Sequence, residues 1–302
     1  VIIGAFLGGI FFEKTLPHDI LPEDRKGQTE SISEPKDVHF STFWDAWNMI
    51  GANFIGASSL DKKNMEYGAT SGLAESLGDP NTRFLNPEET RRLNENIVEG
   101  TELTTAEWEL LKKDIAYVKL FRFTRAANSD FMSMVPAILQ SKAKSIVLDL
   151  RDNPGGAIDA FLSIAGRFFK KGETIAVESF GEGRGEFVHI SQGEGEFKAY
   201  PVVILINANT ASVAEVFANA MRESKGSQLG GEPSMGKVTV QKILTLSGDT
   251  ALVLTTSELL SPNRHAVSKT GLLPDVEVGI LEGENDLQLQ KAIQALKSAV
   301  NF

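Results

Sequence analysis

The chain has 302 residues, of which 42% are hydrophobic, and this is enough to build one sizeable domain and a smaller one. Its formal net charge is −10 and its basic residues are scattered, which argues against nucleic-acid binding. The absence of cysteine excludes disulfides and cysteine-based metal or redox centres. We expect neither a cofactor nor a metal ion.

Residues 1–12 are all apolar or glycine. This run is shorter than the roughly 18 to 20 residues that span a bilayer, and the chain begins without methionine, so we interpret it as the end of a truncated membrane anchor or signal segment. A buried strand or helix is the alternative. Residues 13–39 contain three prolines and many charges, which is typical of a flexible linker. Together the two segments predict an extracytoplasmic protein tied to a membrane.

Residues 40–95 show helical periodicity in two stretches. Aromatic residues recur at helical spacing from Phe40 to Phe54, and a second apolar stripe runs from Met65 to Leu77 after Asp61. The pattern predicts an N-terminal helical region in which the two stripes form a helix–helix core.

After a short connector, residues 96–114, strands and helices alternate over 115–280, and a C-terminal helix lies within 281–302. Strands are predicted near 115–121, 145–150, 173–178, 186–190, 201–206, 238–243 and 251–256, and helices near 129–141, 157–169, 212–224 and 286–300. Pro136 predicts a later start for the first of these helices. The alternation places the main domain in the α/β class.

Two glycines follow the apolar strand that ends at Leu150. Gly155 and Gly156 lie in the turn before a helical stripe, and glycine lets backbone amides approach a ligand closely. A plain strand-to-helix turn explains the same residues.

Ser212 lies where another apolar strand, 201–206, turns into a helix. Free backbone N–H groups and the positive end of the helix dipole are therefore expected beside its hydroxyl, and such donors suit an oxyanion. Taken alone, Ser212 is better explained as an ordinary helix N-cap.

Lys237 and Gln241 lie at the start of a later β-branched strand. Side chains four apart on a strand share a face, so Gln241 can reach the same pocket as Lys237. A lysine activates a serine only when neutral, so burial must lower its pKa from about 10.4 toward about 7 to 8. Taken alone, Lys237 is better explained as a surface lysine at the end of a strand. The four histidines match no serine-histidine-aspartate pattern, and no G-x-S-x-G motif is present.

The segments together resemble the carboxyl-terminal processing peptidases, or tail-specific proteases. Residues 145–156 resemble the family's "LDLR-N-P-G-G" signature, residues 78–85 its "G-D-P-Y-T-R-F-L", and residues 261–276 a run near the end of its catalytic domain. The likeness covers roughly residues 40 to 278. We expect the second and third stretches to be structural rather than catalytic.

The resemblance implies a crotonase-like or ClpP-like spiral of strands and helices, and a role for each matching residue. Ser212 is the nucleophile, Lys237 the general base and Gln241 the residue that orients the base. Gly155 or Gly156 joins Val213 in the oxyanion hole. Val213 and Val238 are bulkier than the usual alanine and glycine, which predicts a narrower pocket.

One segment of the family pattern is absent. The relatives carry a peptide-binding PDZ domain between the helical region and the catalytic sheet, whereas here only residues 96–114 stand in its place. So short a segment buries too little surface to fold as a PDZ domain.

We therefore predict a serine endopeptidase that cleaves extracytoplasmic proteins by a Ser-Lys dyad through an acyl-enzyme. Its partners would be protein or peptide substrates, a membrane through the N-terminal segment, and a second copy in a homodimer; the family suggests a bacterial source. A catalytically silent scaffold that binds a partner protein is one alternative. A crotonase-type acyl-CoA enzyme is another, disfavoured because Ser212, Lys237 and Gln241 match peptidase positions together.

Overall fold

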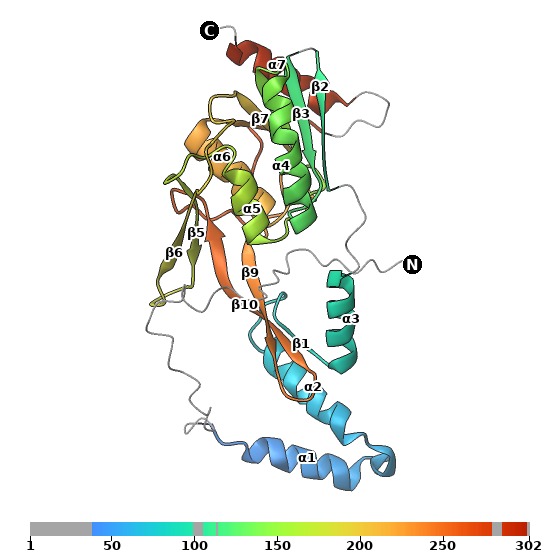
Figure 1. Ribbon diagram of the computed structural model, residues 1–302. Coiled ribbons are helices and arrows are strands. Elements are labelled where there is room, and N and C mark those ends of the chain that lie inside the picture. The colour runs from blue at the N-terminus through green and yellow to red at the C-terminus, as the bar shows by residue number, and fades with distance from the viewer. Residues whose placement is uncertain (1–37, 99–104, 113, 280–285, 301–302) are drawn as a thin grey trace.

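The computed structural model describes residues 38–98, 105–112, 114–279 and 286–300 (Figure 1). The predicted anchor 1–12 and nearly all of the predicted linker lie outside these residues. No described helix combines the length and the apolar character needed to cross a bilayer.

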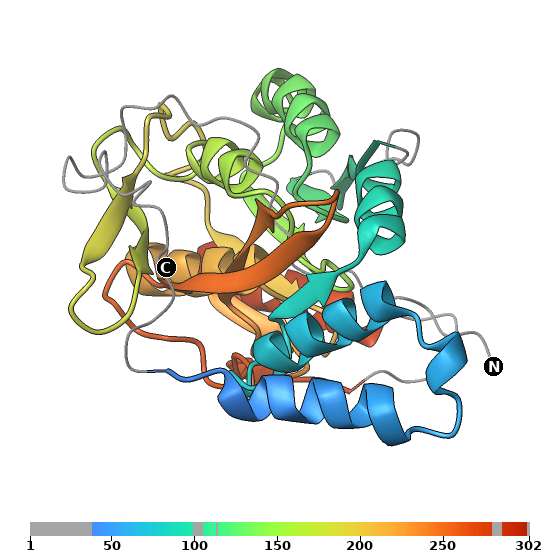
Figure 2. The same cartoon turned by 90° about the horizontal axis from the view of Figure 1, so that it is seen from below.

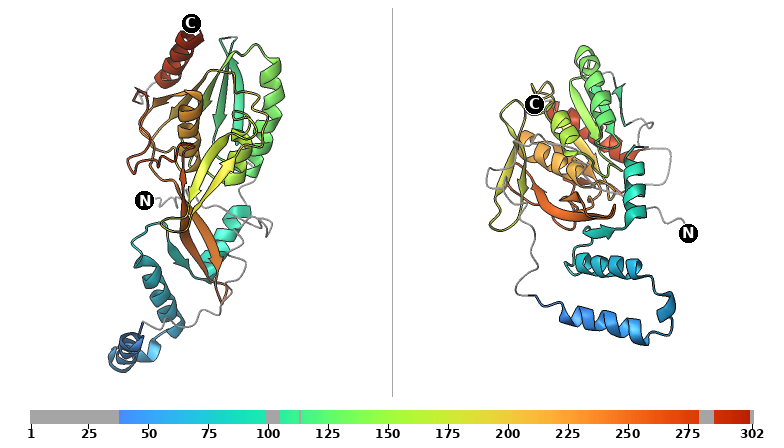
Figure 3. Two further views of the ribbon diagram at one scale, coloured as in Figure 1. Left: turned by 90° about the vertical axis from the view of Figure 1, so that its left-hand side faces the viewer. Right: turned by 60° about the horizontal axis from the view of Figure 1, so that its bottom comes forward.

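Two helices at the N-terminal end extend away from the rest of the molecule (Figures 1 and 3). They are α1 (Ser41–Asn53) and α2 (Lys62–Glu75), joined by the short 3₁₀ helix η2 (Ala57–Ser59). The Asp61 side chain caps α2 by accepting hydrogen bonds from the Lys63 and Asn64 N–H groups, which satisfies donors that a helix start leaves unpaired.

The predicted helix–helix core between these helices is wrong. α1 contains no buried residue, Trp44 is 55% exposed, and the only buried residue of α2 is Ala74. The helices lie side by side (Figure 2), but Phe43, Trp44 and Trp47 face α2 across an open groove. Their rings contact one another along α1 instead. Helical periodicity identifies an apolar face and leaves its packing partner undetermined.

A six-stranded mixed sheet forms the centre of the main domain. Its strands, in spatial order, are β11 (Val276–Glu277), β8 (Gln228–Gly231), β7 (Val202–Ile206), β4 (Ser145–Asp149), β3 (Ile115–Leu120) and β2 (Ala106–Leu111). All neighbours are parallel except β2 and β3, which form an antiparallel hairpin. β2 lies in the stretch that the sequence predicted to be only a connector, and residues 99–105 alone separate it from α3 (Pro87–Val98).

Both faces of this sheet are covered. All five residues of β4 are buried, with Ile146 and Leu148 in the main core and Val147 in a smaller core beneath α7 (Leu287–Val300). α4 (Arg125–Gln140), α5 (Ile158–Ala165) and α6 (Val213–Lys225) gather on the side of the main core, and α7 lies on the opposite side (Figure 3). Parallel strands with near-continuous apolar runs require cover on both faces.

α4 begins earlier than predicted and tolerates its proline. The Thr124 hydroxyl caps the helix by accepting a hydrogen bond from the Ala127 N–H at 3.0 Å. Pro136 lies on the exposed face, where water can satisfy the carbonyl that the missing N–H leaves unpaired.

A second, five-stranded sheet is built around the long strand β10 (Ala251–Leu260). Its other strands are β1 (Arg83–Leu85), β9 (Thr239–Thr245), β5 (Thr174–Ser179) and β6 (Glu186–Ile190). β1, β9 and β5 each pair with β10 in antiparallel fashion. Because β1 follows α2, this sheet joins the N-terminal helices to the main domain.

Candidate active site

Two turns meet at one edge of the six-stranded sheet. β4 and β7 are parallel neighbours, so the turn after β4, residues 150–157, and the turn after β7, residues 207–212, leave the sheet side by side. Ligand sites in open parallel sheets lie at the carboxyl ends of such strands. The predicted glycines and Ser212 are thereby brought together.

Ser212 has a rare backbone conformation and a hydroxyl without a hydrogen-bond partner among the described residues. Its φ of 60° and ψ of −129° belong to a region that L-residues rarely adopt, and it directly precedes α6. The residue is 2% exposed, and its Oγ has no hydrogen-bond partner among the described residues. Ser212 is thus the N-cap residue of α6, as the alternative explanation had it, and its N–H donates to the Glu215 carboxylate, but its hydroxyl makes no cap hydrogen bond.

Gly155 lies directly against Ser212. A Cβ added to Gly155 would lie 2.7 Å from Ser212 Cβ and 3.2 Å from Ser212 Oγ, closer than a side chain tolerates. Gly156 meets a different neighbour, since its added Cβ would lie 2.0 Å from the Phe123 carbonyl oxygen. Each glycine thus allows a close backbone approach that any other residue would block.

The N–H groups of Gly155 and Gly156 differ in their hydrogen bonding. The Gly155 N–H donates to Asn153 Oδ1 at 2.9 Å, whereas within the described part of the chain the N–H groups of Gly156 and Val213 have no hydrogen-bond partner. Gly156 and Val213 are therefore the backbone donors available for an oxyanion.

Side chains that the sequence did not single out lock the two turns together. Asp152 Oδ1 accepts from Asn207 Nδ2 at 2.9 Å and from Asn209 Nδ2 at 2.8 Å. The Ala211 N–H donates to the Asn153 carbonyl oxygen at 2.9 Å. Asp152 and both asparagines lie near the predicted residues in sequence. Only the hydrogen bonds between the two turns show that these three side chains hold the turns together.

A single buried carboxylate joins the Ser212 turn to the Lys237 segment. Glu215 Oε2 accepts from the Ser212 N–H at 3.0 Å and the Lys237 N–H at 2.9 Å, and Oε1 accepts from Ser234 Oγ at 2.5 Å and the Gly236 N–H at 2.7 Å. Burial raises the pKa of Glu215 above its ordinary value, although these four donors favour the charged form. Glu215 therefore fixes the backbones of both predicted catalytic residues.

Lys237 lies in the loop before β9, two residues ahead of the strand. Partial burial lowers the pKa of its ammonium, and the positive charge of Arg83 lowers it further, while Asp79 acts in the opposite direction. A lowered pKa is the condition for a lysine to act as a base. The Lys237 ammonium does not hydrogen-bond to Ser212 Oγ in this structure, because that hydroxyl has no partner.

Gln241 is held by two threonines. Its side chain is almost fully buried, and Nε2 donates to Thr239 Oγ1 at 2.8 Å and to Thr255 Oγ1 at 3.2 Å. The carboxamide oxygen is then the atom that can accept a hydrogen bond from an amine.

The two valines that were predicted to narrow the site are both core residues. Val213 is completely buried and Val238 is 4% exposed, and both pack in the main core.

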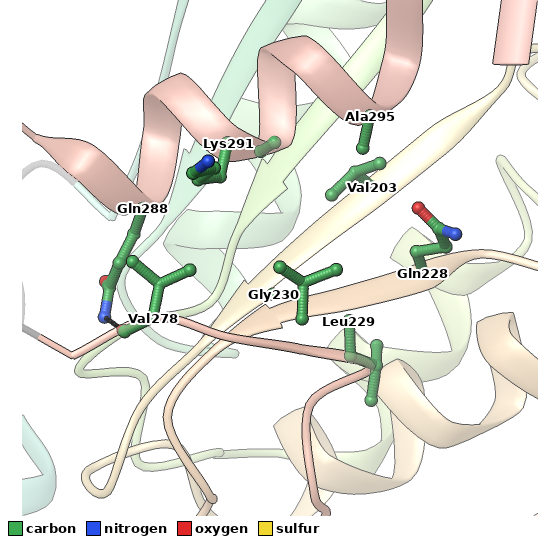
Figure 4. A pocket seen from close by; sticks show the side chains of 10 residues that line it. Val203, Gln228, Leu229, Gly230, Val278, Gln288, Lys291 and Ala295 are labelled. Atoms are coloured by element: carbon green, nitrogen blue, oxygen red, sulfur yellow. Dashed lines mark hydrogen bonds between the residues drawn. The ribbon is translucent and has the colours of Figure 1, made fainter. Parts of the chain in front are cut away.

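A small cavity elsewhere carries no comparable chemistry. It lies between α7 and strands β7 and β8 (Figure 4), and among the described residues that line it Lys291 alone is ionisable. We therefore place the candidate active site at the turns around Ser212.

Curated relatives match a little over half of the chain. The chain is 32% identical over 170 residues to the carboxy-terminal-processing protease of Bartonella bacilliformis, covering 55% of this chain and 39% of that protein. It is 33% identical over 174 residues to the chloroplastic carboxyl-terminal-processing peptidase 3 of Arabidopsis thaliana, covering 58% and 33%. The chain thus spans well under half the length of these two relatives.

Solved structures share the fold. The photosystem II D1 C-terminal processing protease matches with a TM-score of 0.63 and 17% identity over 78% of this chain and 92% of that one. A lipoprotein from Streptococcus agalactiae matches with a TM-score of 0.58 and 18% identity, over 84% and 88%. The predicted α/β fold with N-terminal helices is confirmed.

The model of peptidase family S41 matches residues 114–278, which contain Ser212, Lys237 and both glycines. This match covers more than half of the 302 residues, and the chain therefore belongs to peptidase family S41.

Proposed function

We propose that this protein is a serine endopeptidase in which Ser212 is the nucleophile and Lys237 the general base. One observation carries the proposal: the carboxylate of Glu215 binds the backbones of Ser212 and Lys237 at once, while Gly155 packs against the serine. Membership of family S41 supports it.

The proposed reaction begins when neutral Lys237 Nζ takes the proton of Ser212 Oγ. The oxygen attacks the scissile carbonyl carbon, and the Gly156 and Val213 N–H groups stabilise the resulting oxyanion. Breaking the C–N bond transfers the lysine proton to the leaving amine and leaves an acyl-enzyme. Water, activated by the same amine, then releases the acid. Gln241 orients the amine without adding charge.

The buried, unpaired Ser212 hydroxyl favours one second candidate, a catalytically silent peptidase fold that binds a partner protein. In the catalytic proposal, substrate binding must bring Lys237 Nζ within hydrogen-bond reach of Ser212 Oγ. Catalytic hydrogen bonds that are long or unmade before substrate binding are common in enzymes.

A labelling experiment separates the two candidates. We expect a fluorophosphonate to modify Ser212 in the intact protein, and the Ser212→Ala and Lys237→Arg variants to lose hydrolysis of an unfolded protein such as casein by a factor on the order of 10³ or more. Circular dichroism of each variant controls for folding. If Ser212→Ala keeps more than about a tenth of the wild-type turnover, the nucleophile is another residue.

We further propose that the protein acts outside the cytoplasm of a bacterium, tied to a membrane, and that it forms a homodimer. The apolar run 1–12 supports the tether, and the exposed apolar side chains of α1 support self-association. Cell fractionation tests the location, and sedimentation equilibrium tests the dimer; a protein found only in the soluble cytoplasm, or only as a monomer at micromolar concentration, contradicts the respective proposal.

A further inference from the structure

The segment 79–83, which comprises the turn before β1 and the first residue of that strand, approaches β9, the strand that follows the proposed general base. Asn81 Nδ2 approaches Thr239 Oγ1, the hydroxyl that also receives Gln241 Nε2. The β1 strand that follows the turn pairs with the start of β10. A stretch that the sequence predicted to be only structural is thus brought to the site from 158 residues away.

Hydrogen bonds connect Asp79 to Gln241 through two threonines. Thr82 Oγ1 donates to Asp79 Oδ2 at 2.6 Å and accepts from the Thr255 N–H at 3.1 Å. The Thr255 hydroxyl in turn accepts from Gln241 Nε2. Thr82 and Gln241 are both buried, so no bulk water competes with these bonds.

The charge on Asp79 is stabilised in place. Partial burial raises its pKa, but hydrogen bonds from Thr255, Thr82 and Asn81 outweigh this, and the net pKa lies below its ordinary value. Asp79 is therefore an anion near neutral pH.

Charged groups face Lys237 from three elements. Arg83 lies on β1, Asp79 in the turn before it, and Glu215 on α6, where its carboxylate holds the Lys237 N–H. Arg83 and Asp79 have opposite effects on the pKa of the lysine, and both lie within the five-residue segment 79–83.

On the basis of the proposed Ser-Lys mechanism, we propose that the segment 79–83 is part of the active site and acts on both Gln241 and Lys237. Asp79 and Thr82 are positioning residues that hold Gln241 through Thr255. The same segment brings the opposite charges of Asp79 and Arg83 close to the strand that follows Lys237, where they act on the Lys237 ammonium in opposite directions. Because this segment follows α2 in the chain, the N-terminal region contributes to the site through residues 79–83.

Two charge variants test the electrostatic part in the intact chain. Removing the anion in Asp79→Asn should move the titration midpoint of Lys237 to lower pH, and removing the cation in Arg83→Gln should move it to higher pH. The midpoint is measured by competitive acetylation of Lys237 with acetic anhydride across pH, followed by mass spectrometry. Asp45→Asn on α1 and Lys171→Gln, both at exposed positions, are matched controls and should leave it unchanged.

The same pH series with a fluorophosphonate reports on Ser212. On the acid limb of the labelling profile, Asp79→Asn should react at least about threefold faster than Arg83→Gln. Midpoints that move in the same direction, or that match the two controls, overturn the electrostatic part. If the Lys237 midpoints of the two variants separate as expected, the inference about Lys237 holds. If the rate of Ser212 labelling then does not follow these midpoints, Lys237 is not the base.

A third variant tests the hydrogen-bonded connection without changing charge. Thr82→Val keeps the side-chain shape but removes the hydroxyl that joins Asp79 to Thr255, so the maximal labelling rate should fall by about tenfold while the midpoint stays unchanged. Thr82→Ser should restore the rate. A Thr82→Val protein with wild-type labelling, or a loss that Thr82→Ser does not restore, shows that the threonine does not position Gln241.

Discussion

At the scale of single residues, the proposed nucleophile Ser212 has a strained backbone that its neighbours hold in place. Its backbone conformation costs about 1–3 kcal/mol, a cost that persists only where the surroundings enforce it. Glu215 enforces it from one side through the Ser212 N–H, and Gly155 makes room on the other. In this conformation the hydroxyl has no hydrogen-bond partner among the described residues.

The lowered pKa of Lys237 predicts how activity depends on pH. Only the neutral amine accepts the Ser212 proton, and the neutral fraction increases as pH rises through the lysine pKa, so hydrolysis should rise with pH over that range. The measurement is the pH profile of casein hydrolysis at saturating substrate.

The histidines provide the control for this profile. His189 pairs with Glu178 and His265 with Glu223. We therefore replace all four histidines with glutamine, because its amide can still hydrogen-bond to these carboxylates. The acid limb should be unchanged in this variant, since no histidine is assigned to the reaction. Its disappearance or displacement would show that a histidine is the base.

At the scale of elements, the turn after β4 depends on glycine for a steric reason. Gly155 has a φ of 93°, and an added Cβ would lie 2.7 Å from Ser212 Cβ and 3.0 Å from the Ala211 carbonyl oxygen. Gly155→Ala should therefore displace the serine turn and lower the rate of Ser212 labelling by at least about 100-fold.

Gly172 supplies a matched control for backbone strain. It has nearly the same φ, 90°, but nothing lies within 4 Å of an added Cβ. Gly172→Ala should lose about 1–2 kcal/mol of unfolding free energy from the positive φ, measured by urea denaturation, and should keep its labelling rate. Gly155→Ala should lose more, because its added Cβ also meets Ser212. Equal labelling rates in the two variants would show that the Gly155 contact does not matter to the site.

At the scale of the whole molecule, the arrangement of domains predicts how substrates are chosen. Residues 99–105 alone connect α3 to β2, so we expect no separate module there to capture substrate C-termini. Two model substrates with the same scissile region, one ending in apolar and one in charged residues, should be cut at similar rates. A preference above about tenfold for the apolar tail, roughly 1.4 kcal/mol, would mean that another surface recognises C-termini.

The N-terminal helices show that apolar periodicity in a sequence predicts helices but not how they pack. Their apolar stripes correctly predicted two helices, and the capping residue Asp61 correctly predicted where the second begins. The stripes do not pack into a core with each other, because periodicity is a property of one helix and packing is a property of two.

The sequence by itself determined the elements whose signals are local. The apolar runs of β4 and β7 and the periodicity of α6 and α7 were predictable because each face repeats within its own segment. The short strands β1, β8 and β11 were missed, since a few residues carry no periodicity and exist as strands only through their pairing partners. Ser212, Lys237 and Gln241 were predicted as site residues from their settings in the chain and a family resemblance.

Only the tertiary structure decided how those residues are joined. Glu215 unites Ser212 with Lys237, the Gly156 N–H is left available where that of Gly155 is used, and Asp79 reaches Gln241 through Thr82 and Thr255. These are hydrogen bonds between segments far apart in the chain. Their partners are chosen by strand register and turn geometry, which no local pattern of residue types encodes.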